Sequence, residues 1–545
     1  MGAKPETGRG WAWLMVTLAG VFPFASDMLR NFQLFAPEQL AASLAAIVAA
    51  TGAVFLAAQL VLRGVDAACR RAGRVPGPRL RSVVFALAAA LIFAGFLYDA
   101  NMTELRVAFG LPRLAAAAIV VALFAVYGAV AARLGAKRTC LLLLALLAFR
   151  SVRAGCEISG ALLRGHALMS PEEIRVYQNV KLSRTPNVYF ICLESYHGFG
   201  DMEVLYGLDN SAFRGFLETN GFAVAEGICA NDWHTMSSLH SFFRMGHHYG
   251  SGTFGNHDSL HARGFLSGSG TYYNPVLNVL KRNGYSIVYL LPSDYYYRPG
   301  TGLVDVSLLE RSWPLAPLKV SLPRFVGREP ITYVEDYERK LADAISAWPG
   351  GRPAFFFAKL GAEHVPKQYD CRTDRAEFVE QYKKSVADGN PRIESLCRRI
   401  IAKDPGGIIV LAGDHGAQSY QSKERRFQDV MREDGIPAER IVRDLHGVLL
   451  AIRWGAGLAP EPYPFRSLAN VMRFVLYRLS GDEALRKTAV HDSSYVLEMD
   501  GRLYQTTDDG RPLSEWKAVP RSSPERGPDG QGLRSSAPRA GRTSQ

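Results

Sequence analysis

The chain has 545 residues, 48% of them hydrophobic, and a formal net charge of +12. This length leaves room for a membrane region plus one large domain, or for two medium domains. The basic residues form no single stripe with interleaved aromatic side chains, which argues against a nucleic-acid-binding protein. The seven cysteines include no Cys-x-x-Cys pair, which argues against a zinc finger or a disulfide scaffold.

Residues 1–160 predict a transmembrane helix bundle of about five spans. A membrane-spanning helix needs roughly 20 apolar residues, with a range of about 17–25. The expected spans are 11–28, 40–62, 83–97, 114–134 and, as the weakest, 139–149. The alternative for the last segment is a buried or interfacial helix, because Arg150 and Arg153 end the apolar run early.

The lysines and arginines orient this bundle. They gather before the first span and in the second and fourth loops, and the loops between are poor in them. The positive-inside rule therefore predicts a cytoplasmic N-terminus. Five spans place the chain after about residue 160 outside the cytoplasm, whereas four would leave it inside.

From residue 187 the sequence alternates between short apolar runs and helical patterns. Strands are expected at 187–193, 286–291, 354–360, 408–412 and 448–452, and helices at 209–219, 275–283, 333–348 and 375–403. This alternation predicts an α/β domain with a mostly parallel sheet and helices on both faces. We assign residues 187–519 to this domain, including a hairpin near 496–505. Residues 161–186 are assigned to a linker, and 520–545, rich in Pro, Gly, Ser and Arg, to a disordered tail.

Four predicted strands are followed by polar residues. These are Glu194, then Ser293 and Asp294, then Glu363 and His364, then Asp414 and His415. In open α/β sheets, ligands bind outside the carboxyl ends of the strands. Carboxylate oxygen and imidazole nitrogen suit a divalent cation, so Glu194, Asp414 and His415 are expected to hold one. The alternative is that these residues only cap helices or solvate turns.

A fourth ligand is expected from the segment 231–244. Thr235 precedes apolar residues at helical spacing, so it is predicted to stand at a helix start. A helix N-terminus favours anions, and a hydroxyl beside a metal ion becomes a better nucleophile. Capping alone is the alternative role. Ser237, Ser238 and His234 are close rivals for this position.

With these residues in place, the chain resembles the sulfatase-like branch of the alkaline phosphatase superfamily. Its layout is most similar to lipoteichoic acid synthases and to phosphoglycerol and phosphoethanolamine transferases, which join a membrane bundle to an extracytoplasmic α/β domain. The resemblance rests on Glu194-Ser195 after the first strand, Thr235 at a helix start, Asp414-His415-Gly416 after a late strand, and a looser match at Gly361-Ala-Glu-His364.

The resemblance implies a phosphotransferase of the bacterial cytoplasmic (inner) membrane with one divalent metal ion, manganese before magnesium or zinc. Thr235 would take a phosphoglycerol or phosphoethanolamine head group from a phospholipid donor and pass it to a glycan or lipid acceptor. His364 would bind the phosphate or act as acid/base. We assign substrate contacts to His364, Asp294, Arg244 and Asn390, although Asn390 stands where many members have Asp.

Two alternatives remain open. The first is a phosphoester or sulfoester hydrolase of the same superfamily. Sulfate-ester hydrolysis is disfavoured, because Thr235-Met-Ser-Ser-Leu lacks the Cys/Ser-x-Pro-x-Arg pattern of formylglycine sulfatases. The second is a non-catalytic membrane sensor or scaffold. His247, His248 and Asp294 are loose candidates for a second metal set, but one metal is the expectation.

Overall fold

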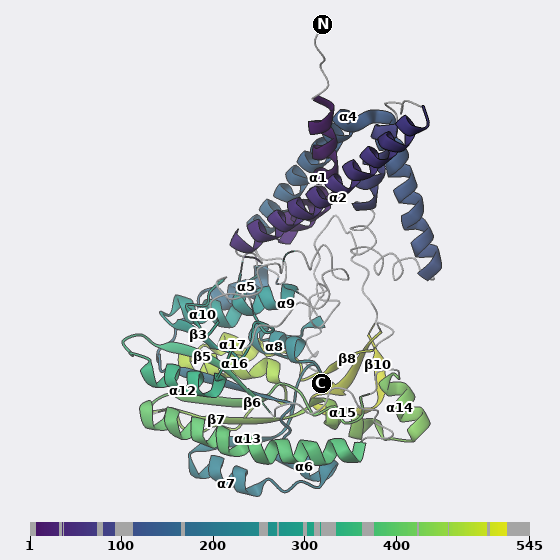
Figure 1. The fold of residues 1–545 in the computed structure, drawn as a ribbon. Helices are drawn as coiled ribbons and strands as arrows, with labels where there is room; N and C mark the ends of the chain where they lie inside the picture. The colour runs from purple at the N-terminus through teal and green to yellow at the C-terminus, as the bar shows by residue number, and fades with distance from the viewer. Residues whose placement is uncertain are drawn as a thin grey trace, which may run out of the picture.

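The structure is a computed structural model that describes most of the chain. The described residues are 7–31, 35, 37–73, 80–92, 113–164, 169, 171–249, 260–269, 272–297, 302–309, 317, 334–361, 375–421, 425–455, 457–498 and 502–519. A group of long helices near the N-terminus lies at one end of the molecule, and an α/β domain lies at the other (Figure 1).

The α/β domain contains two sheets. Its strands are β1 Val188–Glu194, β2 Phe222–Cys229, β3 Ser286–Leu290, β4 Val306–Ser307, β5 Ala354–Gly361, β6 Ile408–Gly413, β7 Gly447–Arg453, β8 Tyr495–Leu497, β9 Leu503–Asp508 and β10 Arg511–Ala518. The helices of this domain and of the segment before it are α5 Pro171–Gln178, α6 Phe199–Tyr206, α7 Ser211–Thr219, α8 Thr235–Arg244, α9 Leu260–Ser267, α10 Pro275–Arg282, α12 Tyr337–Ala347, α13 Arg375–Lys403, α14 Phe427–Asp434, α15 Ala438–His446, α16 Val471–Ser480 and α17 Glu483–Lys487.

The larger sheet has seven strands in the order β2-β7-β6-β1-β5-β3-β4. Strand β1 lies near its centre and pairs in parallel with β5 and β6. Strand β3 also pairs in parallel with β5 and β4, whereas β7 runs antiparallel to β6 and to β2. The sheet is therefore mostly parallel, as the sequence predicted. Strands β8, β9 and β10 form a separate antiparallel sheet. The hairpin prediction is confirmed for β8 and β9, and its turn residues 499–501 lie outside the described residues.

Helices cover both faces of the large sheet, because successive side chains of a strand point to opposite faces. On one face, Phe190 and Cys192 of β1 join a core with residues of α8, α10 and α16. On the other face, Ile191 and Leu193 join a core with residues of α6, α7, α12 and α13. By the same alternation, Glu194 at the end of β1 belongs to the α8 face.

The N-terminal helices are α1 Thr7–Asn31, α2 Pro37–Arg71, a helix over Leu80–Ile92, and α4 Arg113–Arg164. Within the described part of the chain, one helix, α2, is long and apolar enough to cross a membrane; Gly10–Ala25 and Leu80–Ile92 are shorter apolar stretches. The predicted fourth and fifth spans fall within α4, which breaks at Gly135 (φ 72°, ψ 164°). The described helices therefore do not support the multi-pass arrangement, partly because the predicted third span runs into residues outside the described ranges.

Candidate metal and nucleophile site

Three of the predicted ligands meet at the carboxyl end of the sheet. One ligand atom each from Glu194, Asp414 and His415 lies within 4.8 Å of the others. Glu194 ends β1, and Asp414 follows β6 directly. The two strands are neighbours with Leu193 opposite Gly413, so residues far apart in sequence stand side by side. The predicted convergence of these three residues is confirmed.

Thr235 joins this group from α8. Its Oγ1 lies 3.0 Å from Nε2 of His415, and its side chain is buried. Thr235 is the first residue of α8, after the extended N-cap His234. The helix forms here because its apolar side chains pack on the sheet; Phe242 stacks on Phe190 with ring centroids 4.0 Å apart. The N-terminal end of α8 therefore lies beside the cluster at Thr235, and a helix N-terminus favours anions.

The rival serines have other contacts. Ser237 Oγ donates to the carbonyl oxygen of His234 at 3.1 Å, which closes the first turn of the helix. Ser238 Oγ donates to the carbonyl oxygen of Asp414, which ties α8 to the loop after β6. Of the three hydroxyl groups, Thr235's is the one that contacts His415.

Backbone groups orient Asp414 and His415. Asp414 Oδ1 accepts the N–H of Ser195 at 2.9 Å and that of His415 at 3.0 Å. Nδ1 of His415 lies 2.8 Å from the carbonyl oxygen of Gly416 and 3.1 Å from the side-chain amide nitrogen of Gln418. Nε2, on the other side of the ring, faces Thr235 and Glu194, which is the orientation that a metal-ligating histidine needs.

The sequence reasoning missed Lys359, which lies in the middle of the cluster. Its Nζ is 2.7 Å from Glu194 Oε2 and 2.7 Å from Asp414 Oδ2. The side chain is 3% exposed, and the ammonium lies 5.1 Å from the ring centroid of Tyr296. The available signal was a lone lysine inside the apolar run of β5, since lysine is almost never fully buried unless it is paired.

Burial and charge oppose each other at this cluster. Burial alone raises the pKa of Asp414, but His415, Lys359 and the N–H of Ser195 hold that pKa below its usual range. Burial alone lowers the pKa of Lys359, but the neighbouring Asp414 and Glu194 raise it well above its usual range. Both groups are therefore charged near neutral pH.

The donor set fits one divalent cation. Glu194 Oε1 and Asp414 Oδ2 each lie 3.6 Å from Nε2 of His415, and Thr235 Oγ1 is close by. Two carboxylates, an imidazole nitrogen and a hydroxyl suit manganese, magnesium or zinc. The carboxylates of Glu194 and Asp414 and the ammonium of Lys359 together carry a net charge of −1, which a divalent cation would encounter on binding.

A buried network fixes the loop that carries Asp414 and His415. His197 is neutral, because burial lowers its pKa to about 3, and its Nε2 accepts the N–H of Ala417 at 2.8 Å. Asp444 accepts from Ser419 Oγ at 2.7 Å and from the N–H of Tyr420 at 3.2 Å. These groups hold the loop in place without contacting the ligand atoms.

Gly416 offers a test of this loop. An added Cβ would lie 2.1 Å from the carbonyl oxygen of Asp444 and 2.6 Å from Cε1 of His197. Gly416→Ala should therefore displace the loop, lower the free energy of unfolding by about 1–3 kcal/mol and weaken metal binding. Denaturant titration and metal analysis measure the two effects. Gly215→Ala in α7 is the matched control, because its Cβ meets nothing within 4 Å. Equal behaviour of the two variants would contradict the rigid-loop interpretation.

Two residues that were predicted to bind substrate have contacts within the protein. Arg244 ends α8, nine residues from Thr235, which is about 13 Å at the rise of an α-helix. Its Nη2 lies 3.5 Å from Glu173 in α5, so it connects α8 to the segment before the sheet. Asn390 accepts from Tyr196 OH at 2.6 Å and donates to Asn210 Oδ1 at 2.8 Å. Both side chains therefore contact other protein side chains, and their roles in substrate binding stay predictions.

The remaining predictions have mixed outcomes. Asp294 is buried after β3, two residues before Tyr296, which contacts Lys359. The end of β3 thus approaches the cluster as expected. His364 lies outside the described residues, so its role stays a prediction.

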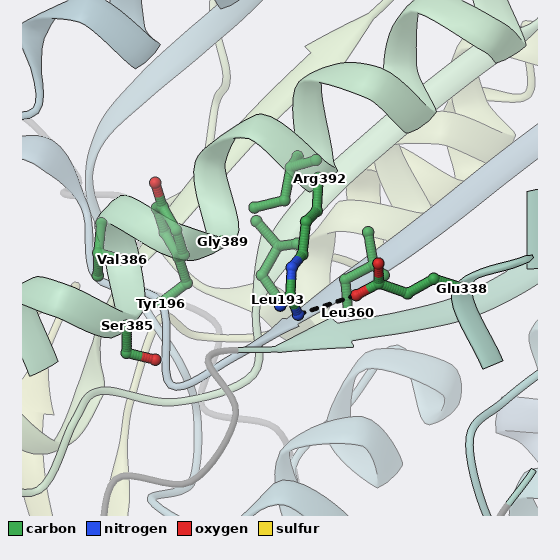
Figure 2. Close-up of a pocket in the computed structure, with 9 residues that line it drawn as sticks. Leu193, Tyr196, Glu338, Leu360, Ser385, Val386, Gly389 and Arg392 are labelled. Atoms are coloured by element: carbon green, nitrogen blue, oxygen red, sulfur yellow. Dashed lines mark hydrogen bonds and ion pairs between the residues drawn. The ribbon is translucent and has the colours of Figure 1, made fainter. Parts of the chain in front are cut away.

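Two pockets lie near the sheet end, but neither includes the cluster. The smaller, about 20 Å³, lies between α13 and the ends of β1 and β5, and has room for about one water molecule. Figure 2 shows Leu193, Tyr196 and Leu360 at this pocket, with Arg392 reaching to Glu338. The larger, about 490 Å³, lies between α12 and α13.

No known protein-family profile matches the chain, and no curated protein matches it. Several solved structures resemble it. The periplasmic domain of EcEptC from Escherichia coli in complex with Zn has 15% identity and a TM-score of 0.37, covering 56% of this chain and 85% of that one. A protein in the alkaline phosphatase superfamily from Vibrio parahaemolyticus has 11% identity and a TM-score of 0.37, covering 65% of this chain and 89% of that one. The lipoteichoic acid synthase LtaP from Listeria monocytogenes has 11% identity and a TM-score of 0.36, covering 65% of this chain and 93% of that one.

These proteins are of the kinds that the sequence resembles. The identities are below 25%, so the likeness concerns the fold alone.

Proposed function

We propose that this protein is a membrane-anchored, metal-dependent phosphotransferase that moves a phospholipid head group through a covalent intermediate on Thr235. The observation that carries the proposal is the Thr235 hydroxyl, 3.0 Å from His415 Nε2 and at the start of α8. A buried nucleophile candidate, a metal-type donor set and a helix N-terminus coincide there. The first two suit nucleophilic attack and the third suits a phosphate group.

The reaction would proceed in two displacements. Thr235 Oγ1 attacks the phosphorus of the donor phosphodiester and loses its proton, while diacylglycerol leaves with the bonding electron pair and takes up a proton. An acceptor hydroxyl on a glycan or lipid then attacks the same phosphorus and frees Thr235. A bound divalent ion would lower the pKa of the threonine hydroxyl and offset charge on the phosphate oxygens. His364 remains the candidate for proton transfer to the leaving oxygen.

The residues of the cluster have separate parts in this scheme. Glu194, Asp414 and His415 would hold the ion, and the N–H groups at the start of α8 would face the phosphate oxygens. Ser238 fixes the helix to the Asp414 loop, so that the nucleophile keeps its place beside His415. Since a phospholipid donor lies in a bilayer, the apolar helix α2 supplies an anchor at the donor's own surface.

Mass spectrometry tests the proposal directly. The full-length protein is incubated with manganese and vesicles of phosphatidylglycerol or phosphatidylethanolamine, and its peptides are mapped. A head-group phosphate on Thr235 supports transfer, and the added mass identifies the head group. A second incubation with an acceptor separates the two enzyme classes: transfer labels the acceptor, whereas hydrolysis releases the free head-group phosphate. Absence of any adduct and any product with both lipids would leave the scaffold interpretation.

The membrane arrangement gives a separate prediction. Five spans and a cytoplasmic N-terminus, as the sequence pattern predicts, would place the α/β domain outside the cytoplasm. A phosphatase reporter fused after residue 519 should therefore be active, and a cytoplasmic reporter at the same position should be silent. The reverse result would remove one span and place the domain on the cytoplasmic face of the lipid bilayer.

A further inference from the structure

Lys359 places a positively charged side chain of the protein among the proposed ligands of a divalent metal ion. An ammonium group has three N–H donors. Here they face Glu194 Oε2 and Asp414 Oδ2, each at 2.7 Å, and Cys192 Sγ at 3.7 Å. The side chain is buried, so water does not replace any of these contacts.

Strand register explains why the lysine is there. Lys359 lies opposite Cys192 in the parallel pair of β1 and β5. Its side chain shares the α8 face with Phe357, two residues earlier, as Glu194 shares that face with Cys192. The ammonium therefore approaches the carboxylates from within the sheet, while Thr235 approaches from α8.

The ammonium and a metal ion would use the carboxylates differently. Glu194 turns Oε2 to Lys359 and Oε1 toward Nε2 of His415, so its two oxygens can serve the two cations separately. Asp414 has less freedom. Its Oδ1 accepts two backbone N–H groups, so Oδ2 must face both Lys359 and the ion. The lysine thus offsets the negative charge of Asp414 Oδ2, the one oxygen of that carboxylate that faces the ion.

We propose that Lys359 is a permanent cation of the metal site, which holds Glu194 and Asp414 together without a divalent ion and makes the binding of that ion weaker and reversible. The proposal rests on the metal site of the proposed function and adds a residue that sets its affinity. Two carboxylates without a partner would repel each other in a buried setting, whereas the ammonium pairs with both. When the ion binds, the two cations share the same carboxylates and repel each other.

The effect on affinity has a definite sign. Like charges a few ångströms apart in a protein environment disfavour each other strongly, even with the effective dielectric constant of about 20 that suits such sites. Removing the ammonium should therefore tighten manganese binding by about tenfold or more. It should also destabilise the metal-free protein, because the buried Asp414 and the partly exposed Glu194 lose the ammonium that pairs with both.

Lys359→Met tests both consequences on the full-length protein in detergent. Methionine keeps the length of the side chain and removes its charge. Manganese affinity is measured by titration against a competing chelator, and melting temperature is measured with manganese and with the chelator alone. We expect tighter manganese binding, a metal-free melting temperature lower by about 5 °C or more, and a larger rise on adding manganese than the unmodified protein shows.

Lys383→Met is the matched control. It removes the same charge from α13, on the other face of the sheet, where Lys383 pairs with Glu380. Both manganese affinity and melting temperature should stay close to those of the unmodified protein. If metal-free Lys359→Met does not fold, it is purified with manganese and the chelator-driven release rate is measured, with slower release expected.

The outcomes separate this inference from the proposed function. Equal or weaker manganese binding by Lys359→Met, with normal binding by the unmodified protein, overturns the inference and leaves the proposed function standing. Manganese binding by Lys359→Met, with no manganese binding by the unmodified protein, supports the lysine as the cation of the site and removes the metal from the proposed function. No binding by either protein overturns both, and faster release from Lys359→Met also overturns the inference.

Discussion

Thr235→Ala should abolish the covalent adduct and lower turnover by at least about a thousandfold, with the fold retained. The hydroxyl that contacts His415 disappears, and no other hydroxyl among Thr235, Ser237 and Ser238 contacts that ring. Losses of this size follow the removal of an enzyme's nucleophile. Turnover on phospholipid vesicles and peptide mapping measure the two effects, and thermal melting checks the fold.

The neighbouring serines are controls of graded strength. Ser237→Ala loses the contact with the carbonyl oxygen of His234 and a hydrogen bond with Tyr249, and it keeps the Thr235 hydroxyl beside His415, so most activity should remain. Ser238→Ala loses the contact between α8 and the Asp414 loop, so a moderate loss is expected. An adduct on Ser237 in the Thr235 variant would show that the nucleophile was misassigned. Turnover without any adduct would indicate direct attack by the acceptor or by water.

Asp414→Ala should have the second large effect, since it removes a metal ligand and a partner of Lys359 together. The metal content should fall from about one ion per chain toward zero, because the remaining donors lose a carboxylate. Removing one partner of a buried ion pair costs about 3–5 kcal/mol, and both Asp414 and Lys359 are buried. The free energy of unfolding should fall by about that amount.

Metal analysis and denaturant titration measure these losses. Asp343→Ala is the control, because its side chain is 65% exposed in α12 and should change neither quantity. The double variant Asp414→Ala with Lys359→Met should recover part of the stability, since no lone charge remains buried. Unchanged metal content in Asp414→Ala would place the metal elsewhere in the protein.

Local sequence patterns were sufficient for the strands and their polar ends. The apolar residues of β1 and β6 are buried along each strand. The run in β1 ends at Glu194, and the run in β6 is followed directly by Asp414. Parallel neighbours must bring such ends to one edge, so Glu194, Asp414 and His415 could be grouped from sequence alone. The helix start at Thr235 was predictable too, because the apolar spacing after it marks a face that packs on a sheet.

The selection among nearby candidates needed the three-dimensional structure. Thr235, Ser237 and Ser238 share one helical turn, and their sequence gives no direction relative to His415. The contacts of Arg244 with Glu173 and of the Asn390 amide with Tyr196 and Asn210 also follow from the tertiary structure and have no local sequence signal.

The sequence by itself determined the fold class and the grouping of Glu194, Asp414 and His415 at one edge of the sheet, because these follow from short-range periodicity and from the direction of parallel strands. Only the tertiary structure decided that Thr235 faces His415 and that Lys359 lies between Glu194 and Asp414. The physical reason is that strand order and register bring β5, β1 and β6 together across long stretches of chain, and no local pattern encodes which buried polar groups then become neighbours.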